Sequence, residues 1–101
     1  MSIKKRVLKS KPECKVTFVL DKEACSDAET VTIVGDFNNW NRSETQLKKS
    51  KNGDFTVTMN LASGKDYQYR YLINDNKWIN DWNADSYAPT EYDSENSVVS
   101  I

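Results

Sequence analysis

Residues 55–73 read FTVTMNLASGKDYQYRYLI, and this stretch decides the class of the fold. Residues 55–61 and residues 67–73 each alternate apolar or aromatic side chains with polar ones. A period of two is typical of β-strands that have one face in a core and the other in solvent. Ser63-Gly64 separates the two runs with residues that favour turns. The stretch therefore predicts two consecutive strands.

The same pattern continues on both sides of this stretch. Residues 14–20 alternate in the same way, while residues 31–33 and 98–101 form shorter runs. Asn52-Gly53, placed just before the strand that starts at Phe55, is a strong hairpin pattern. Since no stretch shows a sustained helical stripe, these short strands predict an all-β, antiparallel sandwich.

Three other segments are expected to connect the strands. Asn74-Asp75-Asn76 is expected to turn the chain back into a strand at residues 77–79. Residues 37–43 and 80–96 are polar, rich in Asn and Asp, and do not alternate. We expect both to be irregular, and binding residues are often found on such segments.

The composition restricts the class of function. The chain has 101 residues, a formal net charge of −1, three tryptophans and no histidine. This is the size of a single domain. The absence of histidine removes the commonest general base and the commonest metal ligand. We therefore expect a binding or structural module that uses no metal or other cofactor, and not an enzyme.

The charge is unevenly distributed along the chain. Residues 1–22 carry seven Lys or Arg side chains against two acids, whereas residues 75–101 carry six acids and one lysine. We interpret residues 1–12 as a basic arm or an edge strand, and residues 13–101 as the folded domain. Aromatic residues are not interleaved with the early basic residues, so nucleic acid is not expected as a partner.

The cysteines and the apolar runs predict a location. Cys14 and Cys25 are too few for a disulfide scaffold, and we expect a buried, reduced Cys14, although a disulfide with Cys25 is compatible with the sequence. The N-terminus lacks the apolar segment of a secretory signal, and no run approaches the roughly 20 apolar residues of a membrane helix. The sequence therefore predicts a cytoplasmic protein with no membrane partner, either a monomer or a weak dimer paired through edge strands.

The tryptophans are the most informative residues. Trp40 closes the run Gly-Asp-Phe-Asn-Asn-Trp, and Trp82 also lies between polar residues, whereas core tryptophans normally lie in apolar runs. Trp78 precedes Ile79, so one of the two must face outward in an extended segment. An exposed indole near amide and guanidinium groups suits a pyranose, which has an apolar face and polar hydroxyls. Capping of the sandwich ends by these indoles is the competing structural interpretation.

Four features occur in a fixed order over about residues 14–101. They are residues 31–40 (VTIVGDFNNW), residues 67–71 (YQYRY), Trp78, and residues 95–99 (ENSVV). As an ordered set they resemble the glycogen-binding domain, which is the family-48 carbohydrate-binding module or isoamylase N-terminal domain. That family occurs in branching and debranching enzymes and in the β-subunit of AMP-activated protein kinase. The resemblance implies an immunoglobulin-like, early-set β-sandwich that binds α-glucans such as glycogen, starch or malto-oligosaccharides.

The resemblance also implies roles for single residues. Trp40 and Trp78 match the two stacking tryptophans of the sugar-binding members. Arg70 matches a basic residue that contacts sugar hydroxyls. A polar contact near the last strand falls on Asn96, or on Ser97 with a shift of one residue.

Two further residues, Lys77 and Trp82, are expected to assist at the rim of the site. Residues 82–89 look like those of small stand-alone bacterial members of the family and not like the kinase subunit. The aromatic residues expected in the core are Phe37, Tyr69 and Tyr71.

The sequence features and the resemblance are compatible with two functions. The first is a non-catalytic α-glucan-binding module. The alternative is an early-set interaction module that docks to a separate glucan-active enzyme or other partner through residues 4–11 or 81–96, without binding sugar. The acids of the C-terminal region, Asp81, Asp85, Asp93 and Glu95, are interpreted as a solvated loop. A glycosidase needs a groove that encloses the scissile bond, and the spacing of a calcium-binding EF-hand is absent.

Overall fold

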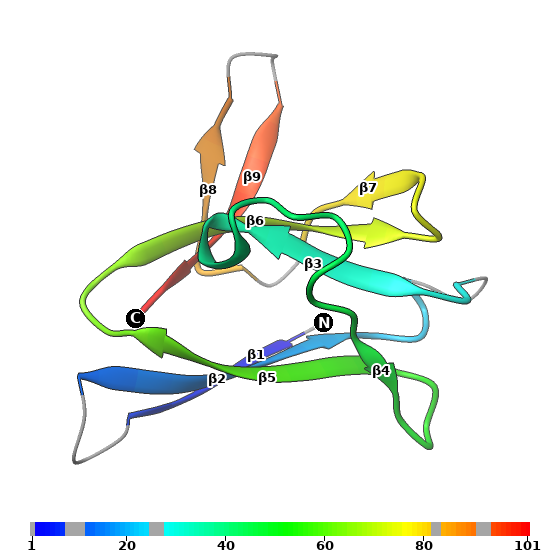
Figure 1. Ribbon diagram of the computed structural model, residues 1–101, viewed down its shortest axis with the longest axis horizontal. Coiled ribbons are helices and arrows are strands. Elements are labelled where there is room, and N and C mark those ends of the chain that lie inside the picture. Colours follow the sequence, from blue (N-terminus) through cyan, green and yellow to red (C-terminus); the bar gives the residue numbers. More distant parts are fainter. Residues whose placement is uncertain (1, 8–11, 25–27, 82–83, 91–93) are drawn as a thin grey trace.

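The computed structural model describes residues 2–7, 12–24, 28–81, 84–90 and 94–101, which form two antiparallel sheets and one 3-10 turn, η1 (Asp36–Asn38) (Figure 1). The first sheet has the order β1-β2-β5-β4, made of β1 (Ser2–Val7), β2 (Glu13–Leu20), β5 (Phe55–Ala62) and β4 (Lys48–Lys49). The second has the order β3-β6-β9-β8, made of β3 (Val31–Gly35), β6 (Asp66–Ile73), β9 (Glu95–Ser100) and β8 (Ser86–Pro89), and β7 (Lys77–Ile79) also pairs with β6. The predicted fold, an antiparallel all-β sandwich of the immunoglobulin-like type, is confirmed.

The inner faces of the two sheets form the core. Alternate residues of β2 are buried, and Cys14 among them is a free, buried thiol. The ring of Phe18 packs edge-on to Tyr69 of β6, with centroids 5.1 Å apart, and Phe37 of η1 lies 5.8 Å from Phe18. Such aromatic pairs contribute roughly 0.5–1.5 kcal/mol beyond the burial of their area. Tyr71 is buried beside them, so the predicted core aromatics are in the core.

The predicted hairpins are present. β4 pairs with β5 across the Asn52-Gly53 turn, where Gly53 has a φ of 95° that favours glycine. β6 pairs with β7 across residues 74–76. Ser63-Gly64 instead carries the chain from β5 in the first sheet to β6 in the second.

β3 differs from the expectation that every strand has a solvent face. All five of its residues are buried. β6 covers one edge of β3, and the chain returns along the other edge, where Ile33 N donates to Thr45 O and Leu47 N donates to Val31 O. The returning segment and the η1 turn therefore bury a strand that alternation alone would leave half exposed.

The prediction that residues 80–96 are irregular was wrong. The segment contains all of β8 and the start of β9, which pair from Ser86↔Val98 to Pro89↔Glu95. β8 has no alternation and ends in a proline, which argues against a strand on sequence grounds. Proline is tolerated here because β8 is an edge strand and needs no hydrogen bond on its outer side.

The N-terminal residues form an edge strand of the first sheet. β1 pairs with β2 along its whole length, from Ser2↔Val19 to Val7↔Cys14. In the part of the chain that the structure describes, no helix is long and apolar enough to cross a membrane.

Candidate functional site

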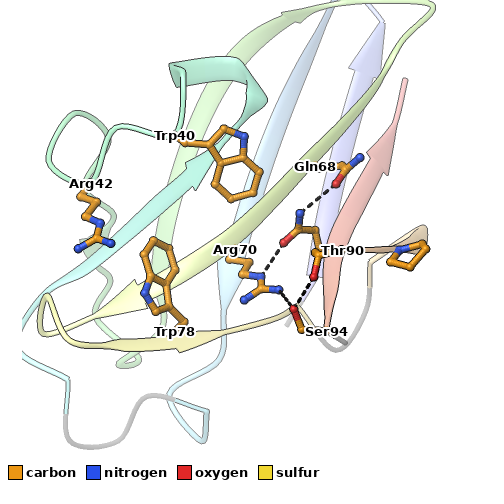
Figure 2. Close-up of a pocket in the computed structure, with 9 residues that line it drawn as sticks. Trp40, Arg42, Gln68, Arg70, Trp78, Thr90 and Ser94 are labelled. Atoms are coloured by element: carbon orange, nitrogen blue, oxygen red, sulfur yellow. Dashed lines mark hydrogen bonds between the residues drawn. The ribbon is translucent and has the colours of Figure 1, made fainter. Parts of the chain in front are cut away.

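An open groove of about 750 Å³ lies on the outer face of the second sheet. Figure 2 shows the indoles of Trp40 and Trp78 on one side of the groove and a hydrogen-bonded polar row on the other. The groove is lined by Trp40, Arg42, Gln68, Arg70, Trp78, Pro89, Thr90, Ser94 and Asn96. Four of the six predicted site residues therefore surround one concavity, although they come from four different segments of the chain.

The position of the groove follows from the pairing of β6. β6 pairs with β9 over residues 66–69 and with β7 over residues 71–73. Since β3 occupies the opposite edge over residues 69–73, β7 and β9 lie on the same edge of β6. Arg70 is the residue between their two pairings, and its side chain projects from the outer face at that junction.

The turn after β3 presents Trp40. Buried Asn38 ties this turn together, because its Oδ1 accepts a hydrogen bond from Gly35 N at 3.0 Å and its Nδ2 donates to Ile33 O at 2.9 Å. Asn39 and Trp40 then have φ values of 56° and 58°. Left-handed φ is uncommon for a tryptophan, and such strain occurs at functional sites. The result is an indole that remains 37% exposed outside the core.

Asp36 fixes the orientation of this indole. Its Oδ1 accepts a hydrogen bond from Trp40 Nε1 at 2.9 Å, while its Oδ2 accepts one from the backbone N of Gln68 at 2.8 Å. One carboxylate therefore connects the tryptophan to β6. Because the polar edge of the ring is bonded, the ring presents an apolar surface to the groove.

Gly35 allows the η1 turn to lie directly against β6. A Cβ atom at this position would come within 2.5 Å of Gln68 O and 2.7 Å of Tyr69 Cβ. Real Cβ atoms do not approach backbone oxygen so closely, so a side chain here would push the turn away from the sheet.

Trp78 forms the second aromatic surface of the groove. It lies on β7 opposite Leu72, and 37% of its surface is exposed, whereas Ile79 packs against the core. Of the neighbours Trp78 and Ile79, the tryptophan is thus the one that faces outward. The guanidinium carbon of Arg42 lies 5.4 Å from the centroid of the Trp78 ring in a cation–π contact.

Arg70 is held in place by the end of β9. Its Nε donates to Asn96 Oδ1 at 2.6 Å, and its Nη2 donates to Ser94 Oγ at 3.0 Å and to the backbone O of Glu95 at 2.8 Å. Asn96 Nδ2 in turn donates to Gln68 Oε1 at 2.9 Å. Among the described residues Arg70 Nη1 has no hydrogen-bond partner, so two N–H groups of a positioned guanidinium are free for a ligand.

The structure places Asn96 and Ser97 on opposite faces of β9. Asn96 lines the groove, whereas Ser97 is buried, and its Oγ donates to Asn80 Oδ1 and accepts from Asp81 N. Of the two alternatives, Asn96 is the one that faces the groove.

Of the two residues expected at the rim, Lys77 is not part of the groove lining. Lys77 is exposed next to Trp78 on β7, and successive residues of a strand point to opposite faces, so it projects away from the groove. Trp82 lies outside the residues that the structure describes.

The C-terminal acids do not form one solvated loop. Asp81 is fully buried, and its Oδ2 accepts a hydrogen bond from Tyr69 Oη at 2.8 Å. Burial, the neighbouring Tyr71 and the charge of Asp81 together raise the pKa of Tyr69 well above its ordinary value. Asp81 is therefore a structural anchor for the β7–β8 connection, and the expectation that it is solvated was wrong.

Asp85 and Glu95 lie elsewhere on the surface. Asp85 forms an ion pair with Lys5 of β1 and accepts a hydrogen bond from Ser100 N at 2.8 Å. Glu95 is exposed, and Asp93 lies outside the described residues. None of the described carboxylates lines the groove.

Five groove residues were not predicted from the sequence: Arg42, Gln68, Pro89, Thr90 and Ser94. Gln68 precedes Arg70 by two positions, so the period of two would have placed it on the same face. Arg42 has no local pattern that distinguishes it from other surface cations. Thr90 and Ser94, whose hydroxyls lie 2.7 Å apart, reach the groove only through the unpredicted β8–β9 hairpin.

Two comparisons with known proteins bear on this groove. A family model described as the glycogen recognition site of AMP-activated protein kinase matches residues 16–101. The 1,4-alpha-glucan-branching enzyme of Saccharomyces cerevisiae is 38% identical over 68 residues, which are 65% of this chain and 9% of that enzyme. The chain thus spans only a small part of this curated relative.

Proposed function

The chain belongs to the family of the glycogen recognition site of AMP-activated protein kinase, and from this membership we propose that it is a non-catalytic module that binds α-glucan in the groove. Trp40 and Trp78 stack on glucose rings, while Arg70 and Asn96 hydrogen-bond to sugar hydroxyls. The observation that carries the proposal is the meeting of two partly exposed indoles and a guanidinium with free N–H groups in one groove.

The chemistry of the lining supports a neutral sugar ring as the ligand. A pyranose has an apolar face of C–H groups that stacks on an indole, and a perimeter of hydroxyls that need hydrogen-bond partners. Because Asp36 bonds the Trp40 N–H and β9 bonds Arg70, both groups are oriented before the sugar arrives. Such preorganisation lowers the ordering cost of binding.

The expected affinity is modest. If each indole removes about 100 Å² from water, the two contribute at most about 5 kcal/mol at roughly 25 cal/mol per Å². The cost of association offsets much of this, so dissociation constants between micromolar and millimolar are expected for short oligosaccharides. A polymer that offers many sites to an assembly of modules binds more tightly.

Our proposal also covers the setting in which the module acts. We place it in the cytoplasm, where it holds a glucan polymer for a separate glucan-active enzyme. The similarity to a small part of a branching enzyme supports an association of that kind. Trp82 and Lys77 remain candidates for contacts with longer glucan chains.

The test is isothermal titration calorimetry with maltoheptaose on the wild-type chain and on Trp40→Ala and Trp78→Ala. Each substitution removes one stacking surface, and we expect each to weaken binding by about tenfold or more. Thr58→Ala is the matched control, because Thr58 is exposed on the outer face of the first sheet.

Circular dichroism shows whether each variant retains the β-sandwich. Wild-type affinity in both tryptophan variants would reject the stacking role. No heat of binding to the wild-type chain at millimolar maltoheptaose would reject sugar binding and favour the docking function.

A further inference from the structure

Two guanidinium groups flank the Trp78 surface of the groove, and neither is paired with a carboxylate in the described part of the chain. Arg42 contacts the Trp78 ring through its charge and forms no ion pair with another described residue. Arg70 donates to an amide oxygen, a hydroxyl and a backbone carbonyl, all of which are neutral. Figure 2 shows Trp78 between the two arginines.

The described residues around the groove do not neutralise this charge. No aspartate or glutamate belongs to the described lining. Asp36, which lies at the base of the Trp40 turn, already accepts hydrogen bonds from Trp40 Nε1 and Gln68 N. Since the whole chain has a net charge of −1, the two cations are a local feature and not the result of an overall basic protein.

Neutral hydroxyls do not account for both arginines. The free Nη1 of Arg70 and the amide of Asn96 are enough to bond the hydroxyls of a ring stacked on Trp78. Arg42 adds a second charge with the donor geometry that suits a phosphate group, because a guanidinium presents paired N–H groups to two oxygens at once. A phosphate monoester carries close to two negative charges at neutral pH and three acceptor oxygens.

From this juxtaposition we propose that the groove prefers α-glucans that carry a phosphate monoester, with the phosphate held by Arg42 while Arg70 bonds the hydroxyls of the sugar stacked on Trp78. The inference rests on the proposed glucan binding of the same groove. It adds a ligand class and a specificity-determining residue, Arg42, to that function.

The experiment compares maltoheptaose with a maltoheptaose that bears a single 6-phosphate ester, by calorimetry on the full chain. At low salt we expect the ester to bind about tenfold more tightly, as befits one additional charge-assisted contact. In about 0.5 M salt, where the Debye length shrinks to roughly 4 Å, the ratio of the two dissociation constants falls to about two or three, because Arg42 is exposed to solvent.

The variants identify the residue that is responsible. Arg42→Gln lowers the ratio of dissociation constants at least threefold at low salt, and Arg42→Lys, which keeps the charge but loses the paired donors, gives an intermediate ratio. Lys48→Gln on β4 of the first sheet removes one exposed positive charge far from the groove and leaves the ratio as in the wild type. The ratio is informative even if Arg42→Gln also changes the affinity for the neutral sugar.

The outcomes separate this inference from the function on which it rests. Equal binding of the two sugars by the wild type overturns the phosphate preference while leaving glucan binding intact. An undiminished ratio in Arg42→Gln also overturns it. Failure of both sugars to bind overturns the proposed function and the preference together.

Discussion

The outer faces of the two sheets are built from strands with the same alternation, and the groove formed by the described residues lies on the second sheet. On the first sheet, Thr17 and Thr58 face each other across β2 and β5 with their hydroxyls 2.9 Å apart, flanked by exposed residues such as Lys15 and Asn60. On the second sheet the corresponding outward positions of β6 are Gln68 and Arg70, which lie in the groove.

The difference comes from what lies beside and above the strands. The η1 turn folds over β3 and places Trp40 above the second sheet, and the short β7 adds Trp78 at its edge (Figures 1 and 2). In the described residues nothing comparable covers the first sheet, whose outward side chains are short or charged. Alternation therefore decides which side chains face outward, while turns and short strands decide whether they form a site.

The largest loss of stability is expected when Gly35, which lets the η1 turn lie against β6, is substituted. Gly35→Ala puts a Cβ atom within 2.5 Å of Gln68 O, so the η1 turn must move away from β6. We expect a loss of roughly 2–4 kcal/mol in unfolding free energy, measured by urea denaturation. Gly64→Ala is the control, since it meets no atom within 4 Å and only its φ of 80° opposes it, at a cost of about 1 kcal/mol. Equal costs at the two glycines would contradict the close approach.

Substitution of Asn38 tests whether the η1 turn depends on the hydrogen bonds of this side chain. Asn38→Ala leaves Gly35 N and Ile33 O without their side-chain partner in a buried place, which costs roughly 1–3 kcal/mol. Thermal unfolding measures the loss. Asn60→Ala, at an exposed position on the first sheet, should change stability by less than about 0.5 kcal/mol. A stable Asn38→Ala variant would show that the turn does not depend on this side chain.

Substitution of Asp36 tests whether the orientation of Trp40 on the second sheet contributes to binding. Asp36→Ala frees the Trp40 N–H, so the indole loses its fixed orientation while remaining present. The affinity for maltoheptaose should fall about three- to tenfold, because ordering one side chain costs roughly 0.5–1.5 kcal/mol. Calorimetry provides the value, and an unchanged affinity would mean that Asp36 does not preorganise the site.

The smallest effect on stability is expected for the ion pair between Lys5 and Asp85, which links the two sheets. Partial burial raises the pKa of Asp85, but the hydrogen bonds from Lys5 and Ser100 N and the charge of Lys5 outweigh it and lower that pKa below its ordinary value of 3.8. The ion pair therefore stabilises the fold above about pH 4 and loses this contribution as the pH falls through the lowered pKa.

Lys5→Ala should reduce the melting temperature slightly at pH 7, by no more than the equivalent of about 1 kcal/mol, because solvent reaches both partly exposed side chains and screens the pair. Near pH 2 the wild type and the variant should melt together. Lys15→Ala, on the same sheet, is the control. A difference that persists at pH 2 would show that Lys5 acts through packing and not through Asp85.

The same comparison explains how much could be predicted from the sequence. The buried faces of β2 and β6 follow from alternation, which also places Arg70 on the outer face. β8 was missed because an edge strand that ends in Pro89 has neither alternation nor a full set of hydrogen bonds. Arg42 and Ser94 were missed because they join the groove only through tertiary contacts between segments that are distant in sequence.

The most direct test of glucan binding by the second sheet is a titration of the ¹⁵N-labelled chain with maltoheptaose, followed by NMR. We predict progressive shifts of the indole N–H signals of Trp40 and Trp78 and of the amides near Arg70, while the amides of Thr17 and Thr58 stay in place. Shifts confined to the first sheet, or no shifts at about 10 mM sugar, would contradict the account.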